Sequence, residues 1–240
     1  MKEVNEMKVL VIPDVHLKPE IFDRAMSIME NSDCECAVCV GDVCDDWGCE
    51  WNVELYKETL QKMVEFAKKF PNTLWCYGNH DLAYLWDMYD HPGFSEDAQD
   101  VVCEYFGELE DTGNLAIMHR IDNVVFSHAG LTREFVDDYL DPYRDDIDAM
   151  IEAVNGFGSG FMWDPTSPVW ARPQGGYRCG TVYPPEYLQV VGHTPMRSIE
   201  KEGNLLTTDV FSTWSDGRKF GEEKFCWVDT VTKEWGYIDE

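Results

Sequence analysis

The chain has 240 residues, 44% of them hydrophobic and 27% charged, a balance typical of a globular protein long enough to bury a substantial core. Its formal net charge of −27 creates a field that repels polyanions and disfavours long nucleic acids as partners. The first residues, Met1 to Met7, include charges, and no later run approaches the roughly 18 apolar residues of a membrane span, so we expect neither a secretory signal nor a transmembrane helix and predict a cytoplasmic location.

The first half of the chain predicts alternating strands and helices. Short apolar, β-branched runs predict strands at about 8–13, 36–41 and 73–77, and helices are expected at about 19–31 and 53–69. In the second helix the apolar residues fall mostly on one stripe, as in a helix packed on a core. Alternation of this kind builds a parallel sheet with helices on its faces, so we predict an α/β fold.

Residues 82–112 interrupt this alternation. They are rich in aromatic and acidic residues, and His91-Pro92-Gly93 separates two helical stretches. We interpret the segment as a small helical, cap-like insertion that leans over the site, within a single domain covering residues 1–240. Three of its aromatic residues fall near helical spacing: Tyr84, Trp86 and Tyr89. Such stripes are usually packing, although stacking on a nucleobase is an alternative.

The remainder of the chain is predicted to be mostly strands. The runs 115–119 and 123–127 are expected to pair as a hairpin that turns near residues 121–122. Further strands are expected at about 188–191, 205–210, 224–229 and 235–238. The acidic runs between and after these elements are most simply solvated helix or turn faces.

Nine cysteines are unusual, but their odd number and their positions in apolar strands favour free, reduced and mostly buried thiols. The alternative is a zinc or iron–sulfur site built on Cys34-x-Cys36-x-x-Cys39, with Cys44 and Cys49 beyond it. We disfavour this site because Cys36 and Cys39 would lie on opposite faces of an extended strand. No second Cys-x-x-Cys completes a ligand set.

Six short polar signatures give the chain its most specific pattern. In order they are Asp14-x-His16, Gly41-Asp42-x-x-Asp45, Gly78-Asn79-His80-Asp81, Ser127-His128-Ala129-Gly130, Trp170-Ala171-Arg172 and Gly192-His193-Thr194. Most of them directly follow a predicted strand, and open α/β sheets place their reactive groups at the carboxyl ends of strands. We therefore expect these side chains to meet at one site.

The residue types in these signatures suit metal ions. Carboxylate oxygens and neutral imidazoles are ligands for Mn, Fe or Zn, and a carboxylate such as that of Asp42 can bridge two cations about 3.5–4 Å apart. Each histidine taken alone is more often a core or surface residue. Their joint occurrence with Asp14 and Asn79 at strand ends favours a two-metal site. His91 and His119 fit no signature and are interpreted as structural or surface residues.

With six such blocks in this order, from Asp14 to about Asp209, the chain resembles the calcineurin-like metallophosphoesterase superfamily, and within it the Ser/Thr protein phosphatases and their bacterial and phage relatives. The resemblance implies a four-layer fold, a β-sandwich flanked by helices, with two divalent or trivalent metal ions at the strand ends. Mn is the first expectation, with Fe or Zn as alternatives. The implied ligands are Asp14, His16 and Asp42 for one ion, and Asp42, Asn79, His128 and His193 for the other.

The resemblance also implies three catalytic residues. His80 matches the general acid that protonates the leaving alkoxide, and Asp45 matches the residue that orients it. Arg172 matches the arginine that clasps phosphate in the bacterial and phage relatives. A salt bridge on the acidic surface is the alternative interpretation of Arg172.

The chain departs from the pattern of the protein phosphatases in three places. Asp46 and Trp47 follow Asp45 where these phosphatases usually carry Arg-Gly, so Arg172 acts alone or Arg178 or Arg133 substitutes. Asp81 stands where they mostly carry Glu. In addition, Thr208-Asp209-Val210 lacks the glycine of the last block. These changes weaken the assignment to protein substrates more than the assignment to phosphoester hydrolysis.

Three functions remain open from the sequence. The leading hypothesis is a binuclear metal-dependent phosphatase that attacks phosphomonoesters with metal-activated hydroxide, acting on a phosphorylated small molecule or a Ser/Thr phosphoprotein. The alternative is a nucleotide hydrolase acting on dinucleoside polyphosphates or cyclic nucleotides. An inactive scaffold that binds a protein partner is the third, because fold alone never decides function.

Overall fold

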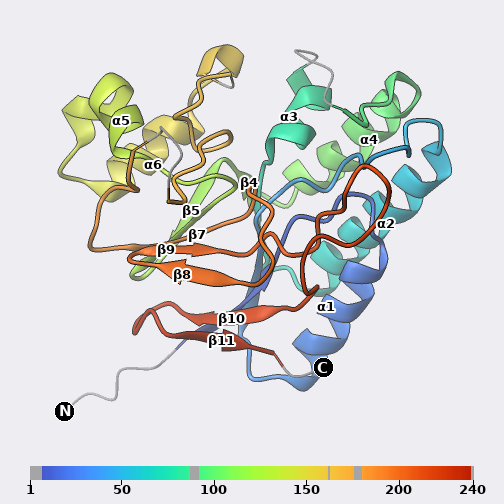
Figure 1. Cartoon of the computed structure of the whole chain (residues 1–240), viewed down its shortest axis with the longest axis horizontal. Helices are drawn as coiled ribbons and strands as arrows, with labels where there is room; N and C mark the ends of the chain where they lie inside the picture. The colour runs from blue at the N-terminus through green and yellow to red at the C-terminus, as the bar shows by residue number, and fades with distance from the viewer. Residues whose placement is uncertain (1–6, 87–91, 162, 176–179, 239–240) are drawn as a thin grey trace.

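A computed structural model describes residues 7–86, 92–161, 163–175 and 180–238 (Figure 1). Two β-sheets form its centre. The six-stranded sheet has the order β11 (Trp235–Tyr237), β10 (Cys226–Asp229), β1 (Lys8–Ile12), β2 (Cys36–Cys39), β3 (Leu74–Cys76) and β4 (Leu115–Ala116). The five-stranded sheet has the order β5 (Met118–Ile121), β6 (Val124–Ser127), β7 (Leu188–Val191), β9 (Leu205–Thr207) and β8 (Glu200–Glu202).

Helices flank the two sheets. The α-helices are α1 (Glu20–Asn31), α2 (Val53–Lys69), α3 (Asn79–Trp86), α4 (Gln99–Glu110), α5 (Arg133–Phe135) and α6 (Ile147–Asn155). Short helical turns lie at Glu96–Ala98, Val136–Leu140, Asp141–Tyr143 and Ser159–Phe161. In Figure 1, α1, α2 and α4 lie on the right of the molecule, whereas α5 and α6 lie at the upper left. The predicted α/β fold with two sheets flanked by helices is confirmed.

The topology brings several strand ends to one edge of each sheet. β1, β2, β3 and β4 run parallel to one another, and so do β6, β7 and β9. Apolar residues of both sheets, such as Val11, Val38, Phe126 and Val190, belong to one buried core. The strands of this core are buried almost throughout, which explains their continuous β-branched and apolar sequences. The loops that follow the parallel strands are therefore held close together.

Helix α2 shows how the sequence positions these layers. Its apolar stripe, including Tyr56, Leu60 and Met63, is buried as predicted. The side chain of Asn52 caps the helix by accepting the Leu55 N–H, a contact worth about 1 kcal/mol. Fully burying one such apolar side chain contributes about 1.5–3 kcal/mol. Packing of the stripe therefore outweighs the cap in holding α2 against the core.

Two details of the second half differ from the prediction. The run 115–119 divides between the sheets, because β4 joins β3 in one sheet and β5 pairs with β6 in the other. Only the part from Met118 forms the predicted hairpin. The edge strand β8 was not predicted, because its sequence Glu-Lys-Glu is entirely exposed and carries no apolar pattern.

The segment 82–112 contains α3 from Leu82 onward, the turn at 96–98 and α4. Tyr84 is fully buried, with its hydroxyl 3.0 Å from that of Tyr56 and its ring stacked on Phe94, so packing accounts for this aromatic residue. Trp86 packs near Phe161. Tyr89 and His91 lie outside the described residues. The cap-like character of the segment and the single-domain organisation stay predictions.

Eight of the cysteines lie in the described part of the chain, and all eight are free. Burial raises the pKa of the Cys39 and Cys44 thiols well above their ordinary value, so these thiols stay protonated and inert. Among the described residues, no cysteine belongs to a group of side chains placed to hold a metal ion. Cys179 lies outside the described residues.

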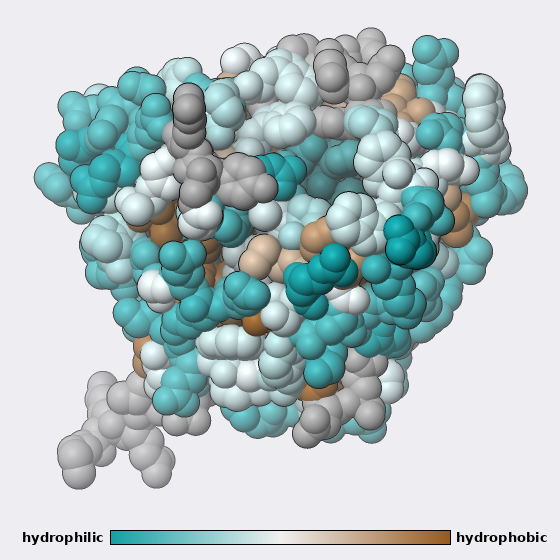
Figure 2. All heavy atoms as spheres, in the orientation of Figure 1, coloured by the Kyte–Doolittle hydropathy of each residue, from teal (hydrophilic) through white to brown (hydrophobic). Residues whose placement is uncertain are grey.

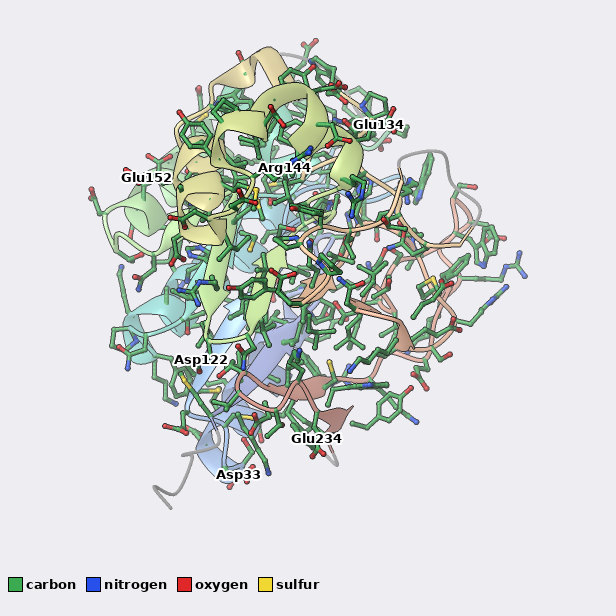
Figure 3. The ribbon with its side chains drawn as sticks, turned by 90° about the vertical axis from the view of Figure 1, so that its left-hand side faces the viewer. Asp33, Asp122, Glu134, Arg144, Glu152 and Glu234 are labelled. Atoms are coloured by element: carbon green, nitrogen blue, oxygen red, sulfur yellow. The ribbon has the colours of Figure 1, made fainter. Side chains whose placement is uncertain are left out.

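The surface agrees with the acidic composition. The face in Figure 2 is mostly hydrophilic, with small separate hydrophobic spots. The labelled acidic residues in Figure 3 are spread along the molecule, from Glu134 at one end to Asp33 at the other. We therefore interpret the negative charge as a solvated surface. Within the described residues, no helix has both the length and the apolar character that crossing a membrane requires.

Candidate metal centre

The six predicted metal ligands all lie just beyond the carboxyl ends of strands. Two follow β1, and one each follows β2, β3, β6 and β7. They are Asp14, His16, Asp42, Asn79, His128 and His193. All are buried except His16, which is partly exposed. The fold brings together residues far apart in the chain, since the His193 N–H donates to Oδ2 of Asp14, 179 positions away, at 2.9 Å.

Four of these side chains surround one point. Nε2 of His128 lies 3.0 Å from Oδ1 of Asn79 and 3.2 Å from Oδ2 of Asp42. It also lies 3.1 Å from Nδ1 of His193. Two oxygens and two ring nitrogens therefore face one another inside the protein.

The two imidazoles of this group are oriented by backbone carbonyls. The Nδ1–H of His128 donates to the carbonyl of Val40 at 2.9 Å, and the Nε2–H of His193 donates to the carbonyl of Trp170 at 3.1 Å. These bonds aim the other two ring nitrogens, Nε2 of His128 and Nδ1 of His193, at each other and at the two oxygens. A metal ion that displaces the proton from Nε2 of His128 would find two ring nitrogens and two oxygens around it, which are donor types that such ions prefer. The donor set therefore fits a metal ion.

A second group joins the first through Asp42. The ligand atoms of Asp14, His16 and Asp42 all lie within 4.8 Å of one another. The Nδ1–H of His16 donates to the carbonyl of Asp45 at 2.9 Å, which leaves Nε2 for a ligand. Oδ1 of Asp14 is buried and accepts no hydrogen bond from the described residues. A buried carboxylate oxygen without a donor is stabilised by a cation, so this group also fits a metal ion.

The pKa shifts of the ligand side chains reflect burial and close contact between charged groups. Burial, followed by repulsion from Asp209, raises the pKa of Asp14 well above its ordinary value. Burial opposes protonation of His128, but the negative charge of Asp42 raises its pKa to about 9. Burial and the positive charges of neighbouring groups, His128 first, lower the pKa of His193. Asp42 and Asp14 thus place negative charge beside His128, where a cation would be stabilised.

The backbone is held in an uncommon conformation at four positions of the site. The residues with positive φ are His16 at 43°, Asp42 at 50°, Asp45 at 49° and His193 at 63°. Such conformations cost on the order of 1–3 kcal/mol each and gather at functional sites. Gly192 shows the crowding, because a Cβ there would lie 1.8 Å from Oδ1 of Asp14. Only glycine can precede the histidine at this position.

His80 lies beside the ligands and forms a pair with Asp45. Its Nδ1–H donates to Oδ1 of the fully buried Asp45 carboxylate, and its backbone N–H donates to Oδ1 of Asp42 at 2.9 Å. Burial lowers the pKa of His80, but the two carboxylates outweigh burial and raise the pKa to about 10. The imidazole is therefore held in a fixed orientation and charged.

A cavity of about 300 Å³ opens beside these groups. The predicted catalytic residues His80, Asp45 and Arg172 line it, together with four of the predicted ligands. Arg172 is the only arginine or lysine among the described residues that line the cavity, and its Nη1–H donates to the carbonyl of His193 at 2.8 Å. The cavity therefore offers one guanidinium next to the metal-ligand groups.

Of the two arginines weighed as substitutes for the missing Arg-Gly pair, the one that the structure describes lies outside the cavity. Asp46 lines the cavity, where its carboxylate accepts from Lys18 Nζ at 3.0 Å and from Thr213 Oγ1 at 2.8 Å. Arg133 is exposed and does not line the cavity. Arg178 lies outside the described residues. Asp46 thus ties the loop after β2 to two neighbouring segments instead of presenting a positive charge.

Asp81 has a role that the sequence pattern did not assign. Its Oδ1 accepts the N–H groups of Val43 and Cys44 at 2.9 and 3.1 Å. Its Oδ2 accepts those of Asp42 and Gly78, both at 2.9 Å. One buried carboxylate thus fixes the loops after β2 and β3, and the only sequence signal was an acid directly after Gly-Asn-His.

Two further residues line the cavity without a predicted role. Asp209 is buried and accepts the Ser212 N–H and hydroxyl at 3.2 and 2.9 Å. Trp47 is 46% exposed at the rim. The available sequence signals were the place of Asp209 in the block Thr208-Asp209-Val210 and the place of Trp47 two residues after Asp45.

The family of the chain follows from comparison with known proteins. The family model described as calcineurin-like phosphoesterase matches residues 7–216, a range that contains every residue of the site. No curated protein matches the chain significantly.

Solved structures are similar to the chain at low sequence identity, and the first of the three below has the same fold. A protein serine/threonine phosphatase from Saccharomyces cerevisiae, with similarity to a human phosphatase, is 17% identical, with 95% of this chain and 74% of that chain covered and a TM-score of 0.55. A metallophosphoesterase from Sphaerobacter thermophilus is 12% identical over 98% and 89% of the two chains, with a TM-score of 0.48. An archaeal phosphodiesterase is 16% identical over 97% and 99%, with a TM-score of 0.42. The last two scores are too low to support a conclusion.

Proposed function

Because this chain belongs to the calcineurin-like phosphoesterase family, a family of metal-dependent hydrolases with a binuclear centre, we propose that it hydrolyses phosphomonoesters. The observation that carries the proposal is the convergence of two ring nitrogens and two oxygens at Nε2 of His128, joined to the unsatisfied oxygen of Asp14 through Asp42. A scaffold without chemistry has no physical need for such a group. Mn is the metal we would test first.

The proposed ligand assignment follows the two groups of side chains. One ion would be held by Asp14, His16 and Asp42, and the other by Asp42, Asn79, His128 and His193. When bound, such ions place positive charge next to a phosphoryl group and lower the pKa of water toward neutrality. The carbonyls that accept from the imidazoles keep the ring nitrogens aimed at the ions.

The chain's own side chains would do the remaining work. Arg172 lies in the cavity wall and can hold the phosphoryl oxygens through two N–H groups. His80 can give a proton to the leaving alkoxide, while Asp45 keeps its Nδ1–H engaged and its ring oriented. Proton donation matters most where the leaving alkoxide is strongly basic.

Phosphoprotein is the substrate class we propose first, and a nucleotide is the second. The half-exposed indole of Trp47 at the rim favours the second, because an aromatic face can stack on a base. The acidic surface repels anions, so it favours substrates that carry little negative charge besides the phosphoryl group that is cleaved. The proposed cytoplasmic location is compatible with either class.

The test uses the purified full chain loaded in turn with Mn, Fe, Co, Ni and Zn. We expect release of phosphate from p-nitrophenyl phosphate with at least one metal, and higher turnover of a Ser/Thr phosphopeptide than of diadenosine tetraphosphate. Preference for the dinucleotide would favour the nucleotide hydrolase. Folded protein that is inactive with every metal, or that binds none of them, would contradict the proposal and favour a scaffold.

A further inference from the structure

A chain of hydrogen bonds runs from Arg172 into the protein interior. Nη1–H of Arg172 donates to Oγ1 of Thr194 at 3.1 Å. The Thr194 hydroxyl donates to Oε1 of Gln174 at 2.9 Å, and Nε2–H of Gln174 donates to Oγ1 of Thr207 at 3.1 Å. Each member uses its donor toward the next, so the bonds share one direction. We call Arg172, Thr194, Gln174 and Thr207 the relay.

The inner members of the relay are shielded from solvent. Gln174 is 8% exposed, Thr194 is 5% exposed and Thr207 is 2% exposed. A buried amide that loses its partners costs about 1–3 kcal/mol, so the bonds are strongly favoured once the side chains are buried. Thr207 ends β9 in the five-stranded sheet. The relay therefore fastens a flexible arginine to a rigid strand.

Gln174 is the only member of the relay that offers both an acceptor and a donor on separate atoms. Its oxygen accepts a hydrogen bond from the Thr194 hydroxyl, so the lone pairs of that hydroxyl remain available to accept from the guanidinium. A residue without the acceptor would free Thr194 to rotate and donate elsewhere. Arg172 would then keep its bond to the His193 carbonyl but lose one of two anchors on Nη1.

We propose that Gln174 is a positioning residue, which acts through Thr194 to aim the guanidinium of Arg172 at the phosphoryl group of the substrate. The inference rests on the proposed function, in which Arg172 holds phosphate. It matters in this chain because Arg172 is the only arginine or lysine among the described residues that line the cavity. A single arginine can hold two oxygens only when its plane is fixed.

The competing explanation is that Gln174 only ties the segment after Arg172 to β9. A structural tie of this kind would lower stability without a specific link to Arg172. The two explanations differ in a double-mutant cycle, because residues that act through one another have non-additive effects.

The experiment measures binding of orthophosphate to the Mn-loaded full chain by calorimetry, alongside kcat and KM. The variants are Gln174→Leu, Arg172→Ala and the double variant, with metal content and thermal unfolding measured for each. We expect Gln174→Leu to weaken phosphate binding about 3- to 10-fold, a loss on the scale of one hydrogen bond, with a rise in KM larger than the fall in kcat. In the Arg172→Ala background the same change should have no further effect on binding.

Two conservative variants keep the test decisive if Gln174→Leu does not fold. Gln174→Glu retains an acceptor for Thr194 and should preserve most of the phosphate affinity. Thr207→Val removes the innermost acceptor of the relay but leaves the Gln174 oxygen for Thr194, so it should weaken binding by less than about threefold. A loss of about threefold or more in Gln174→Glu, which keeps the acceptor for Thr194, would overturn the proposal.

The inference is overturned if the effects of Gln174→Leu and Arg172→Ala on phosphate binding multiply, or if Arg172→Ala binds phosphate as tightly as the wild-type protein. Failure of the proposed function has a different signature. Wild-type protein that hydrolyses no phosphomonoester would contradict that function, whereas the binding cycle decides the role of Gln174 in either case.

Discussion

Asp45 accepts the Nδ1–H of His80 through a carboxylate that is itself completely buried, while its backbone carbonyl accepts the Nδ1–H of His16. One residue thus orients both the proposed general acid and a proposed metal ligand. Because both rings depend on Asp45, their mutual placement, with centroids 5.1 Å apart, is fixed by a single loop position.

This pair gives the first prediction, for His80→Asn. The variant should keep its metal content, and its turnover of an alkyl phosphate should fall about 100-fold or more, within the range of general acid catalysis. Turnover of p-nitrophenyl phosphate should fall much less, because its leaving group needs little protonation. The measurement is kcat on the two substrates together with metal analysis.

The control for this variant is His119→Asn. His119 lies outside the cavity, with its Nε2 bonded to the carbonyl of Trp75, and the same chemical change there should alter both rates equally and slightly. Equal losses on the two substrates in His80→Asn would remove His80 from the acid role.

The second prediction concerns Asp42, whose carboxylate belongs to both groups of metal-ligand atoms. Asp42→Asn removes the negative charge that a bridging ligand supplies, so we expect less than two metal ions per chain after dialysis against dilute Mn. Elemental analysis of the purified protein measures the stoichiometry.

Asp46→Asn is the matched control for Asp42→Asn. Asp46 lies on the same loop and lines the same cavity, but its carboxylate is engaged by Lys18 and Thr213. We expect this variant to hold as much metal as the wild-type protein. Full occupancy of both sites in Asp42→Asn would exclude a bridging role for that carboxylate.

The sequence could predict the features that a short stretch of residues marks, such as a strand followed by a polar signature. The strand-end signatures predicted which side chains meet, because parallel strands bring their carboxyl ends to one edge of a sheet. The edges of the two sheets also adjoin, since Nε2 of His128, after β6, lies 3.2 Å from Oδ2 of Asp42, after β2. The contacts of Asp81 could not be predicted in this way, since its four N–H donors converge only after two loops have folded. The roles of the site residues in binding and catalysis stay predictions.

The elements that escaped prediction lacked a local pattern for a different reason. Strand β8 lies at a sheet edge with every residue exposed, so no hydrophobic alternation marks it. Residues 115–118 form a continuous apolar run, but the chain crosses from one sheet to the other within it. A run that is apolar throughout does not tell which sheet each residue joins.

The third prediction is that metal binding stabilises the fold. The centre gathers buried carboxylates, and an ion that binds only the folded state at 100 times its dissociation constant adds about 2.7 kcal/mol. For a chain of this length we expect the melting temperature to rise by roughly 5–10 °C on adding Mn to chelator-treated protein. Calorimetry with and without Mn measures the change, and no rise would show that the folded protein holds no ion at this site.

The fourth prediction concerns the fold around the site. Asp81→Ala leaves four buried N–H groups without their acceptor, so we expect the free energy of unfolding to fall by at least about 3 kcal/mol. Asp81→Glu keeps the carboxylate and should cost less. Urea denaturation of the metal-free proteins measures both, which separates the loss of hydrogen bonds from any loss of metal.

Asp33→Ala serves as the control for Asp81→Ala, because the Asp33 side chain is 72% exposed and pairs with Lys8 at the surface (Figure 3). Exposed ion pairs contribute at most about 1 kcal/mol, so this variant should unfold near the wild-type midpoint. If Asp81→Ala were equally harmless, water or a rearranged loop would have to satisfy the four N–H groups. Because the proteins compared are metal-free, bound ions could not explain such a result, and the loops after β2 and β3 would then keep their positions without the Asp81 carboxylate.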